Sequence, residues 1–596
     1  MPRFRTAAPQ GRSRRPRRPI ILLTALTLLL PIHAATPPDI NRFFDTFTAD
    51  WVRADPELAT RTQYFSGAEQ DRLDRELAPR TAQHRRQRVE RARRGLADLR
   101  RFDRKQLTPA QRLSARVLEW QLDAIVKSAP YGGYQYFFNQ GIAGFPRTLV
   151  SFLTDVHPAR NARDAENYLN RLSQVAARVD ETIAEARTAA AQGIVPPLFI
   201  LTATIDQIKR LADPEPAANV LVASYSDRLA DPDRQKFRAA ATKLIAESVV
   251  PALRRAIALL EEQTKTATAD AGFSKLPNGA AAYAARLRDS TSTSLTADQI
   301  HRTGLEQVAR IEGQMDVLLR KLGYTEGSVK DRFNKAQDDN LYPDQPGIRT
   351  AILADYEKII RDAEQRSAAL FELRPKAPVV VRRIPEYQER NAAANYSMPA
   401  RDGSRPGTFN VPLVGPRFSR LGMRTLAYHE AVPGHHFQLA LQQEDKGLPR
   451  FRSDRIMREG MAAFAEGWGL YAEALALESG WYDDDPPAKL GALEDQLFRA
   501  RRLVVDTGLH TKGWTRQQAI DYGLPVSEVE RYVAAPGQAC AYMIGQLKIL
   551  EVREKARREL GDKFSLPQFH NVVLLTGGVP LEVLEEAVNE YIATKK

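Results

Sequence analysis

The sequence predicts a mainly α-helical protein with one small β element, and three observations support this fold class. Beyond residue 40, most segments place apolar residues three and four positions apart between charged residues, which is the periodicity of amphipathic helices. Strand-like patterns are confined to one short region. Hydrophobic residues make up 43% and charged residues 27% of the 596 positions, so the chain can bury a large core.

The helical pattern is clearest in three long segments, which are residues 72–99, 164–189 and 233–263. A capping box over residues 296–299, TADQ, predicts the start of another long helix that runs beyond Arg310. No fixed-period repeat, low-complexity tract or composition break divides the chain. We therefore expect one domain over residues 36–596, in which any two lobes are built from non-contiguous segments.

The strand-like patterns lie in two neighbouring segments. Residues 377–384, APVVVRRI, form a β-branched run next to prolines, and residues 402–414 combine turn residues with alternating apolar side chains. We expect these segments to form a small sheet or ribbon. An extended peptide can add to an exposed strand edge, so we expect Phe409 and Val411 to lie on a strand that binds substrate.

The amino terminus has the parts of an export signal. Seven arginines within the first 18 residues precede an 11-residue apolar run at 20–30, and small residues follow it. This run is shorter than the ~20 residues that a membrane span needs. We therefore expect residues 1–35 to be a signal peptide that directs the protein to the periplasm or outside the cell. An uncleaved anchor is the alternative; if the signal is cleaved, no stable membrane embedding is expected.

The net charge and the cysteine content limit the classes of partner and of covalent link that the sequence predicts. The net charge of +13 falls to +6 once the seven amino-terminal arginines are set aside, which is too mild to predict a nucleic-acid partner. The single cysteine, Cys540, excludes an intramolecular disulfide, and no cysteine follows the apolar run to carry a lipid. We expect Cys540 to be a small buried residue rather than a catalytic thiol.

The most informative motif is HEAVPGHH at residues 429–436. Metal-binding helices place two histidines four residues apart, but here Pro433 occupies that position. In an unbroken helix, His435 and His436 would lie ~9 and ~10.5 Å along the axis from His429, too far to share a metal. The Pro433 ring would clash with the carbonyl of His429, so the helix must break there. The break could return His435 or His436 to the metal; a capped helix end with clustered histidines is the structural alternative.

Glutamates downstream could complete such a site. Glu459, Glu466 and Glu473 recur every seven residues, on one helical stripe. Glu466 lies among apolar and small residues, and a buried carboxylate needs a partner or a metal, so we expect it to be the third ligand. Glu459 and Glu473 could then orient a ligand histidine, or form a solvated acidic stripe. The helix-weakening Gly467 and Gly469 indicate a close approach by backbone or substrate.

Four motifs in order resemble the bacterial family catalogued as domain of unknown function 885. They are HEAVPGHHFQ, EGWGLYAE, RLVVDTGLH (502–510) and YVAAPGQACAY (532–542), and the resemblance extends over roughly residues 40–590. The resemblance implies a two-lobed, mostly α, zinc-peptidase-like fold with a deep central cleft. Its general plan is similar to those of thimet oligopeptidase, angiotensin-converting enzyme and carboxypeptidase Taq, from which the Pro-Gly insertion departs.

The same resemblance implies roles for the residues of these motifs. His429, His435 and Glu466 would hold one zinc ion, with His436 as the alternative ligand. Glu430 would be the general base. Donors to the oxyanion would be His510 and Tyr542, with a core histidine and a packed aromatic ring as the structural alternatives. Arg502 would anchor a substrate carboxylate, or pair with a nearby acid such as Asp506.

These expectations favour an exported zinc metallopeptidase that cleaves short peptides. One rival is a metal-dependent amidase that acts on a non-peptide or cell-wall substrate. Another is a non-catalytic protein that binds a ligand in the cleft. Glu430 favours hydrolysis, because a binding protein has no need for a glutamate directly after a ligand histidine. Zinc is the expected metal for a set of two histidines and one glutamate.

Overall fold

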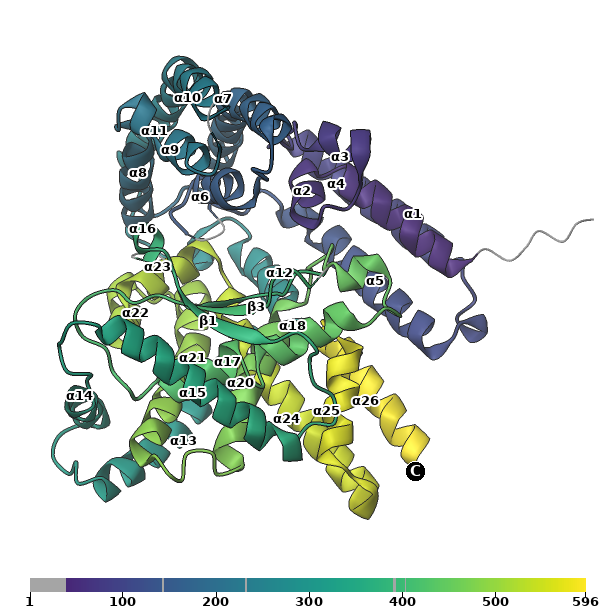
Figure 1. Cartoon of the computed structure of the whole chain (residues 1–596), viewed down its shortest axis with the longest axis vertical. Coiled ribbons are helices and arrows are strands. Elements are labelled where there is room, and N and C mark those ends of the chain that lie inside the picture. Colours follow the sequence, from purple (N-terminus) through teal and green to yellow (C-terminus); the bar gives the residue numbers. More distant parts are fainter. Residues whose placement is uncertain (1–38, 142–143, 231–232, 390–392, 402) are drawn as a thin grey trace, which may run out of the picture. The chain divides into compact units, whose positions relative to one another are not determined.

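The computed structural model describes residues 39–596, apart from 142–143, 231–232, 390–392 and 402. Residues 40–596 form one compact unit (Figure 1), and the expected signal peptide at 1–35 lies outside the described residues. Within that described part, no helix is both long enough and apolar enough to cross a membrane. The unit is mainly helical with a small sheet, so the predicted fold class is confirmed.

The first half of the chain consists of helices that follow the predicted amphipathic segments. The segment 72–99 splits into two helices, whereas 164–189 is one continuous helix. The helices are α1 (Ile40–Arg53), α2 (Pro56–Thr62), α3 (Gly67–Leu73), α4 (Ala82–Leu99), α5 (Pro109–Ser128), α6 (Arg147–Ser151), α7 (Ala162–Ala191), α8 (Leu198–Ala212), α9 (Val220–Ser226), α10 (Asp233–Leu244), α11 (Val250–Thr264) and α12 (Gly279–Thr291).

The second half carries the sheet and the later helices. The predicted capping box opens α13, where the Thr296 hydroxyl accepts from the Gln299 amide N–H, and the Gln299 side chain accepts in return. The helices are α13 (Ala297–Lys321), α14 (Val329–Asp339), α15 (Ile348–Arg366), α16 (Glu386–Glu389), α17 (Met423–Glu430), α18 (His435–Glu444), α19 (Arg450–Ser453), α20 (Ala462–Glu478), α21 (Pro486–Thr511), α22 (Arg516–Asp521), α23 (Val526–Ala534), α24 (Ala541–Leu560), α25 (Leu566–Thr576) and α26 (Leu581–Lys595).

The sheet has three strands, β1 (Val379–Arg383), β2 (Asn395–Ser397) and β3 (Gly407–Val411), in the order β1-β3-β2. β3 is parallel to β1 and antiparallel to β2, so both of its edges are paired. The predicted strands β1 and β3 are confirmed. The expectation that Phe409 and Val411 lie on a substrate-binding edge is wrong, because β3 is the central strand and both side chains are buried. Phe409 instead packs edge-on against Tyr356 of α15.

Two hydrophobic cores stabilise the unit. The smaller core is formed almost entirely by residues 138–260, from α6 to α11. The larger core draws on segments on both sides of that stretch in the chain, from α1 to α26. A cavity of about 980 Å³ is lined by residues of both cores, including Phe152 from the smaller one and Phe273 from the larger one.

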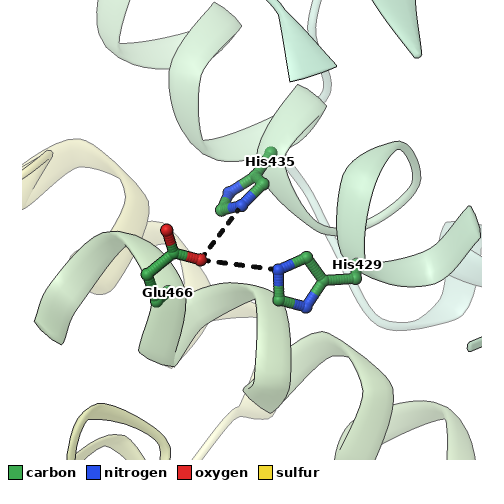
Figure 2. Close-up of side chains that lie close together, drawn as sticks. All are labelled: His429, His435 and Glu466. Atoms are coloured by element: carbon green, nitrogen blue, oxygen red, sulfur yellow. Dashed lines mark ion pairs between the residues drawn. The ribbon is translucent and has the colours of Figure 1, made fainter. Parts of the chain in front are cut away.

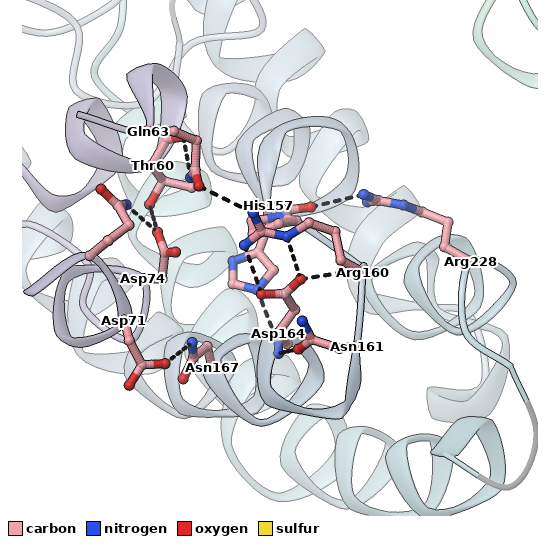
Figure 3. A network of polar contacts seen from close by, with 12 residues as sticks. Thr60, Gln63, Asp71, Asp74, His157, Arg160, Asn161, Asp164, Asn167 and Arg228 are labelled. Atoms are coloured by element: carbon pink, nitrogen blue, oxygen red, sulfur yellow. Dashed lines mark hydrogen bonds and ion pairs between the residues drawn. The ribbon is translucent and has the colours of Figure 1, made fainter. Parts of the chain in front are cut away.

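A buried polar network ties the first helices to the smaller core (Figure 3). Arg171 of α7 is fully buried and donates to the Thr60 hydroxyl at 2.6 Å and to the backbone carbonyls of Leu73 and Glu76. It also donates to Nδ1 of His157 at 2.7 Å, while the other ring nitrogen of His157 donates to the Asp164 carbonyl at 2.9 Å. Every polar group in this set has a partner, as a buried charge requires.

Candidate metal centre

The HEAVPGHH segment breaks the helix where the sequence predicts. α17 ends at Glu430 and α18 begins at His435, so the Pro-Gly pair lies between two helices. A Cβ atom at Gly434 would lie 1.9 Å from the carbonyl oxygen of His429, so only glycine permits this close return of the backbone. The indole N–H of Trp468 donates to the carbonyls of Pro433 and Gly434 at 3.0 and 3.1 Å. The Trp468 bond supplies a partner for the Pro433 carbonyl, whereas the Gly434 carbonyl also accepts from the Gln438 amide at 3.2 Å as α18 begins.

The helix break places the side chains of His429 and His435 next to the carboxylate of Glu466 (Figure 2). Nε2 of each histidine lies 3.6 Å from the same oxygen of Glu466. The three donor atoms all lie within 4.8 Å of one another. Four ligands at ~2.1 Å from a tetrahedral zinc ion are ~3.4 Å apart, so the two 3.6 Å separations are close to that geometry, while the two histidine nitrogens, within 4.8 Å, would have to move closer together.

His436 points away from this cluster. Its Nδ1 accepts from the Tyr396 hydroxyl at 2.8 Å, and its ring also hydrogen-bonds to the backbone of Ala377. Burial lowers the pKa of His436 to about 4, so the ring is neutral and structural. Within the described residues, His435 is therefore the histidine that the fold places beside His429, and the alternative ligand His436 is not.

Glu473 holds His429 in the orientation that a ligand requires. Nδ1–H of His429 donates to Glu473 at 2.7 Å, which leaves Nε2 for the cluster. The same carboxylate accepts from the Thr425 hydroxyl at 3.0 Å and from Gln496 at 3.4 Å. Thr425 and Gln496 were not predicted, because neither lies in a motif that indicates metal chemistry; Glu473 is placed as the sequence predicts.

The electrostatic field at the cluster is strongly negative. Burial alone would lower the pKa of His429, but its hydrogen bonds to Glu466 and Glu473 outweigh burial and raise the pKa to about 10. Burial would likewise raise the pKa of Glu466, but the bonds to His429 and His435 hold it far below its usual range. A site that favours a proton this strongly also favours a metal cation, because both respond to the same carboxylate charges.

Glu430 is a buried carboxylate beside these histidines. Burial raises the pKa of Glu430, while the nearby His435 and His429 oppose the rise. Within the described ranges its carboxylate has no hydrogen bond or ion pair, and the residue is only 8% exposed. A buried acid without a partner is costly, which is typical of a group that acts on a ligand rather than on the fold.

Two glycines of α20 allow this packing. A Cβ at Gly469 would lie 2.5 Å from Cε1 of His429, so the glycine lets the imidazole lie directly on the helix. A Cβ at Gly467 would lie 2.4 Å from the carbonyl carbon of Gly545, where α20 crosses α24. The predicted close approach is therefore confirmed, by backbone at one glycine and by a cluster histidine at the other.

Two further predicted site residues, Glu459 and His510, also lie outside the cluster. Glu459 precedes α20 and pairs with Arg88, because Gly460 adopts a positive φ of +72° against Trp120 and ends the expected helical stripe.

His510 is fully buried, and burial lowers its pKa to about 4. Its Nδ1 accepts from the Phe273 amide and its Nε2 donates to the Tyr532 carbonyl, each at 3.1 Å. Both ring nitrogens are committed, so the expectation that His510 donates to an oxyanion is corrected.

Arg502 and Tyr542 both line the large cavity. The Arg502 guanidinium lies over the Tyr542 ring, 4.4 Å from its centre, and pairs with Glu528 at 3.0 Å. The expected partner Asp506 instead accepts from the Tyr283 hydroxyl at 2.6 Å and from the Gly537 amide. Burial raises the pKa of Tyr542, and the charge of Glu466 raises it further, which places this tyrosine near the cluster.

Solved structures show the same fold. A crystal structure from Colwellia psychrerythraea, described as a "putative lipoprotein", aligns with a TM-score of 0.86 and 29% identity over 94% of this chain and 100% of that chain. A structure from Shewanella oneidensis, described as a "putative lipoprotein of unknown function", aligns with a TM-score of 0.71 and 20% identity over 92% of this chain and 99% of that one.

Sequence comparison gives a family but no characterised relative. No curated protein matches the chain. The profile described as "Bacterial protein of unknown function (DUF885)" matches residues 56–588, which is nearly the whole described unit. The chain therefore belongs to the DUF885 family of bacterial proteins of unknown function.

Proposed function

We propose that this protein is an exported zinc-dependent peptidase that cleaves short peptides. The observation that carries the proposal is the convergence of His429, His435 and Glu466 beside the unpartnered carboxylate of Glu430. A bound zinc ion would polarise the scissile carbonyl and lower the pKa of a water molecule towards ~7. Two imidazoles, which bind zinc once they are deprotonated, and one carboxylate are a donor set that zinc accepts in catalytic sites.

The roles of the neighbouring side chains follow from their positions. Glu430 accepts the proton of the attacking water and passes it to the leaving amine, a task that suits a carboxyl whose pKa burial has raised. Glu473 keeps Nδ1 of His429 protonated and its Nε2 directed at the cluster. The Tyr542 hydroxyl donates to the developing oxyanion from the cavity wall.

Export rests on two observations. The sequence begins with an arginine-rich segment and an apolar run, which is the pattern of a signal peptide. The Colwellia protein at 29% identity is described as a "putative lipoprotein", a description that is consistent with export. In this sequence no cysteine directly follows the apolar run, so we propose a periplasmic or secreted protein rather than one held by a lipid.

Glu430→Gln tests the proposal directly. The variant should retain one zinc ion per chain and lose peptide turnover at least ~100-fold, because it keeps the shape of the side chain and removes the base. Zinc content is measured by metal analysis, and turnover by digestion of a peptide library. Glu478→Gln is a matched control on α20, since Glu478 pairs with Arg553 outside the cluster. Full activity in Glu430→Gln, or no zinc in the reconstituted wild type, would contradict the proposal.

A further inference from the structure

Arg502 has more hydrogen-bond donors than partners. Its side chain is 8% exposed and makes one ion pair, from Nη2 to Glu528. Its Nε and Nη1 are buried and have no hydrogen-bond partner within the described residues. Leaving a buried charged donor unpaired destabilises the fold, so an unpaired guanidinium on a cavity wall indicates a group that binds a ligand.

The surroundings hold this guanidinium in place. It lies between two aromatic rings, with its carbon 4.6 Å from the centre of Phe498 and 4.4 Å from the centre of Tyr542. Glu528 does not depend on Arg502 alone, because Arg531 and the Tyr532 hydroxyl each bond to it at 2.8 Å. A ligand that approaches Arg502 therefore meets a cation that is rigid and only partly neutralised.

The cavity wall that includes Arg502 also includes a residue of α20, the helix that carries Glu466. Tyr542 lines the cavity beside Arg502, and the charge of Glu466 acts on it. Ala462, one helical turn before Glu466, lines the cavity as well. α20 and α24 cross at Gly467 and Gly545, which sets the helix that carries Glu466 against the helix that carries Tyr542.

The charge of the cavity wall favours an anion. Seven arginines and five carboxylates line it. Within the described part, Arg61 has no ion pair and lies over the Phe152 ring instead. Arginine binds carboxylates through planar N–H donors more effectively than lysine does, and such charge-assisted bonds are roughly twice as strong as neutral ones.

We infer that Arg502 binds a carboxylate of the substrate, and that the protein therefore acts on short peptides with a negative group near the scissile bond. The inference rests on the proposed peptidase function for its substrate class. The carboxylate can be the free carboxyl terminus of the peptide or an acidic side chain; both present the same two oxygens to the guanidinium.

Binding to the zinc-loaded Glu430→Gln protein tests this without turnover. Isothermal titration compares three hexapeptides with alanine and leucine side chains: a free acid, its carboxyl-terminal amide, and an amide with glutamate as its last residue. At least one of the two peptides that carry a carboxylate, the free acid or the glutamate amide, should bind at least ~10-fold more tightly than the plain amide. Equal binding of the two amides assigns the site to the carboxyl terminus; tighter binding of the glutamate amide assigns it to an acidic side chain.

Two further variants connect this preference to Arg502. Arg502→Gln should remove it, and Arg502→Lys should leave it clearly weakened. Arg501→Gln should keep it, because Arg501 pairs with Glu312 at 3.1 Å and does not line the cavity. Equal binding of free acid and both amides with Arg502 intact overturns the inference and leaves the peptidase proposal standing. An Arg502-dependent preference in a protein that cleaves no peptide supports the carboxylate site and contradicts the peptidase proposal.

Discussion

At the scale of single residues, the choice between two adjacent histidines depends on what each ring contacts. His435 bonds only weakly to Gln438 through Nδ1, at 3.4 Å, and its Nε2 faces Glu466. His436 has both ring nitrogens engaged, with Tyr396 and with the backbone near β1. One residue further along α18 rotates a side chain by ~100°, so only one of the two can face the cluster.

Glu473→Gln should weaken zinc binding by roughly 10–100-fold, because the amide keeps the hydrogen bond to His429 but removes the charge that raises the basicity of the imidazole. Competition with a coloured chelator measures the zinc affinity. Glu478→Gln, one turn further along α20 and 48% exposed in its side chain, should leave the affinity unchanged. Equal affinities in the two variants would show that Glu473 has only a structural role.

At the scale of elements, the site depends on how closely α20 approaches its neighbours. α20 crosses α24 at Gly467 and receives the His429 ring at Gly469, and its Trp468 bonds to the Pro-Gly segment. Three consecutive residues therefore set the position of Glu466 relative to both histidines. Gly467 and Gly469 lower the helix propensity of α20. Side chains at these two positions would prevent the contacts with α24 and with the His429 ring.

Gly467→Ala should lower the free energy of unfolding by ~2 kcal/mol, because its Cβ would lie 2.4 Å from backbone atoms that cannot move independently. Gly313→Ala on α13 is the control, since that glycine is exposed and has no atom within 4 Å of an added Cβ. It should raise the free energy by ~0.5–1 kcal/mol through helix propensity alone. Urea unfolding measures both; a change of the same sign would contradict the close approach.

The sequence predicts the elements better than it predicts their partners. The helix break at Pro433 can be predicted from the local sequence, because it follows from the missing N–H and the ring of one proline. The position of Glu459 cannot be predicted from its neighbours in the sequence. Trp120, which lies 340 residues earlier, packs against Gly460, and the backbone there turns away from the helical stripe. The partners of His510 and the central place of β3 likewise come from distant segments, which periodicity cannot reveal.

At the scale of the whole molecule, the described unit joins two hydrophobic cores that share a cavity. The hydrogen bonds of Arg171 secure α2 and α3 of the larger core against α7 of the smaller core; Figure 3 shows two of its partners, Thr60 and His157. His157 must stay neutral there, because Arg171 can only donate and therefore needs a lone pair on the imidazole. Burial, and then the charge of Arg171, lower the pKa of His157 to about 3.

This lowered pKa predicts how acid destabilises the fold. Below pH ~6.5 the unfolded chain protonates His157 while the folded chain does not, so stability falls as the pH drops towards about 3. One such histidine contributes ~1.4 kcal/mol per pH unit within that window. His157→Gln should therefore reduce, by about that amount, the steepness with which the free energy of unfolding falls between pH 5.5 and 4.5.

Thr60→Val separates this titration from simple loss of a contact. It removes another acceptor of Arg171, and the hydroxyl that donates to Asp74 at 2.6 Å, without removing a titratable group, so it should lower the free energy of unfolding by a similar amount at each of the three pH values. Urea unfolding at pH 4.5, 5.0 and 5.5 compares wild type and both variants. If His157→Gln changes stability by the same amount at every pH, as expected of Thr60→Val, then His157 is protonated in the fold and the donor assignment at Arg171 is wrong.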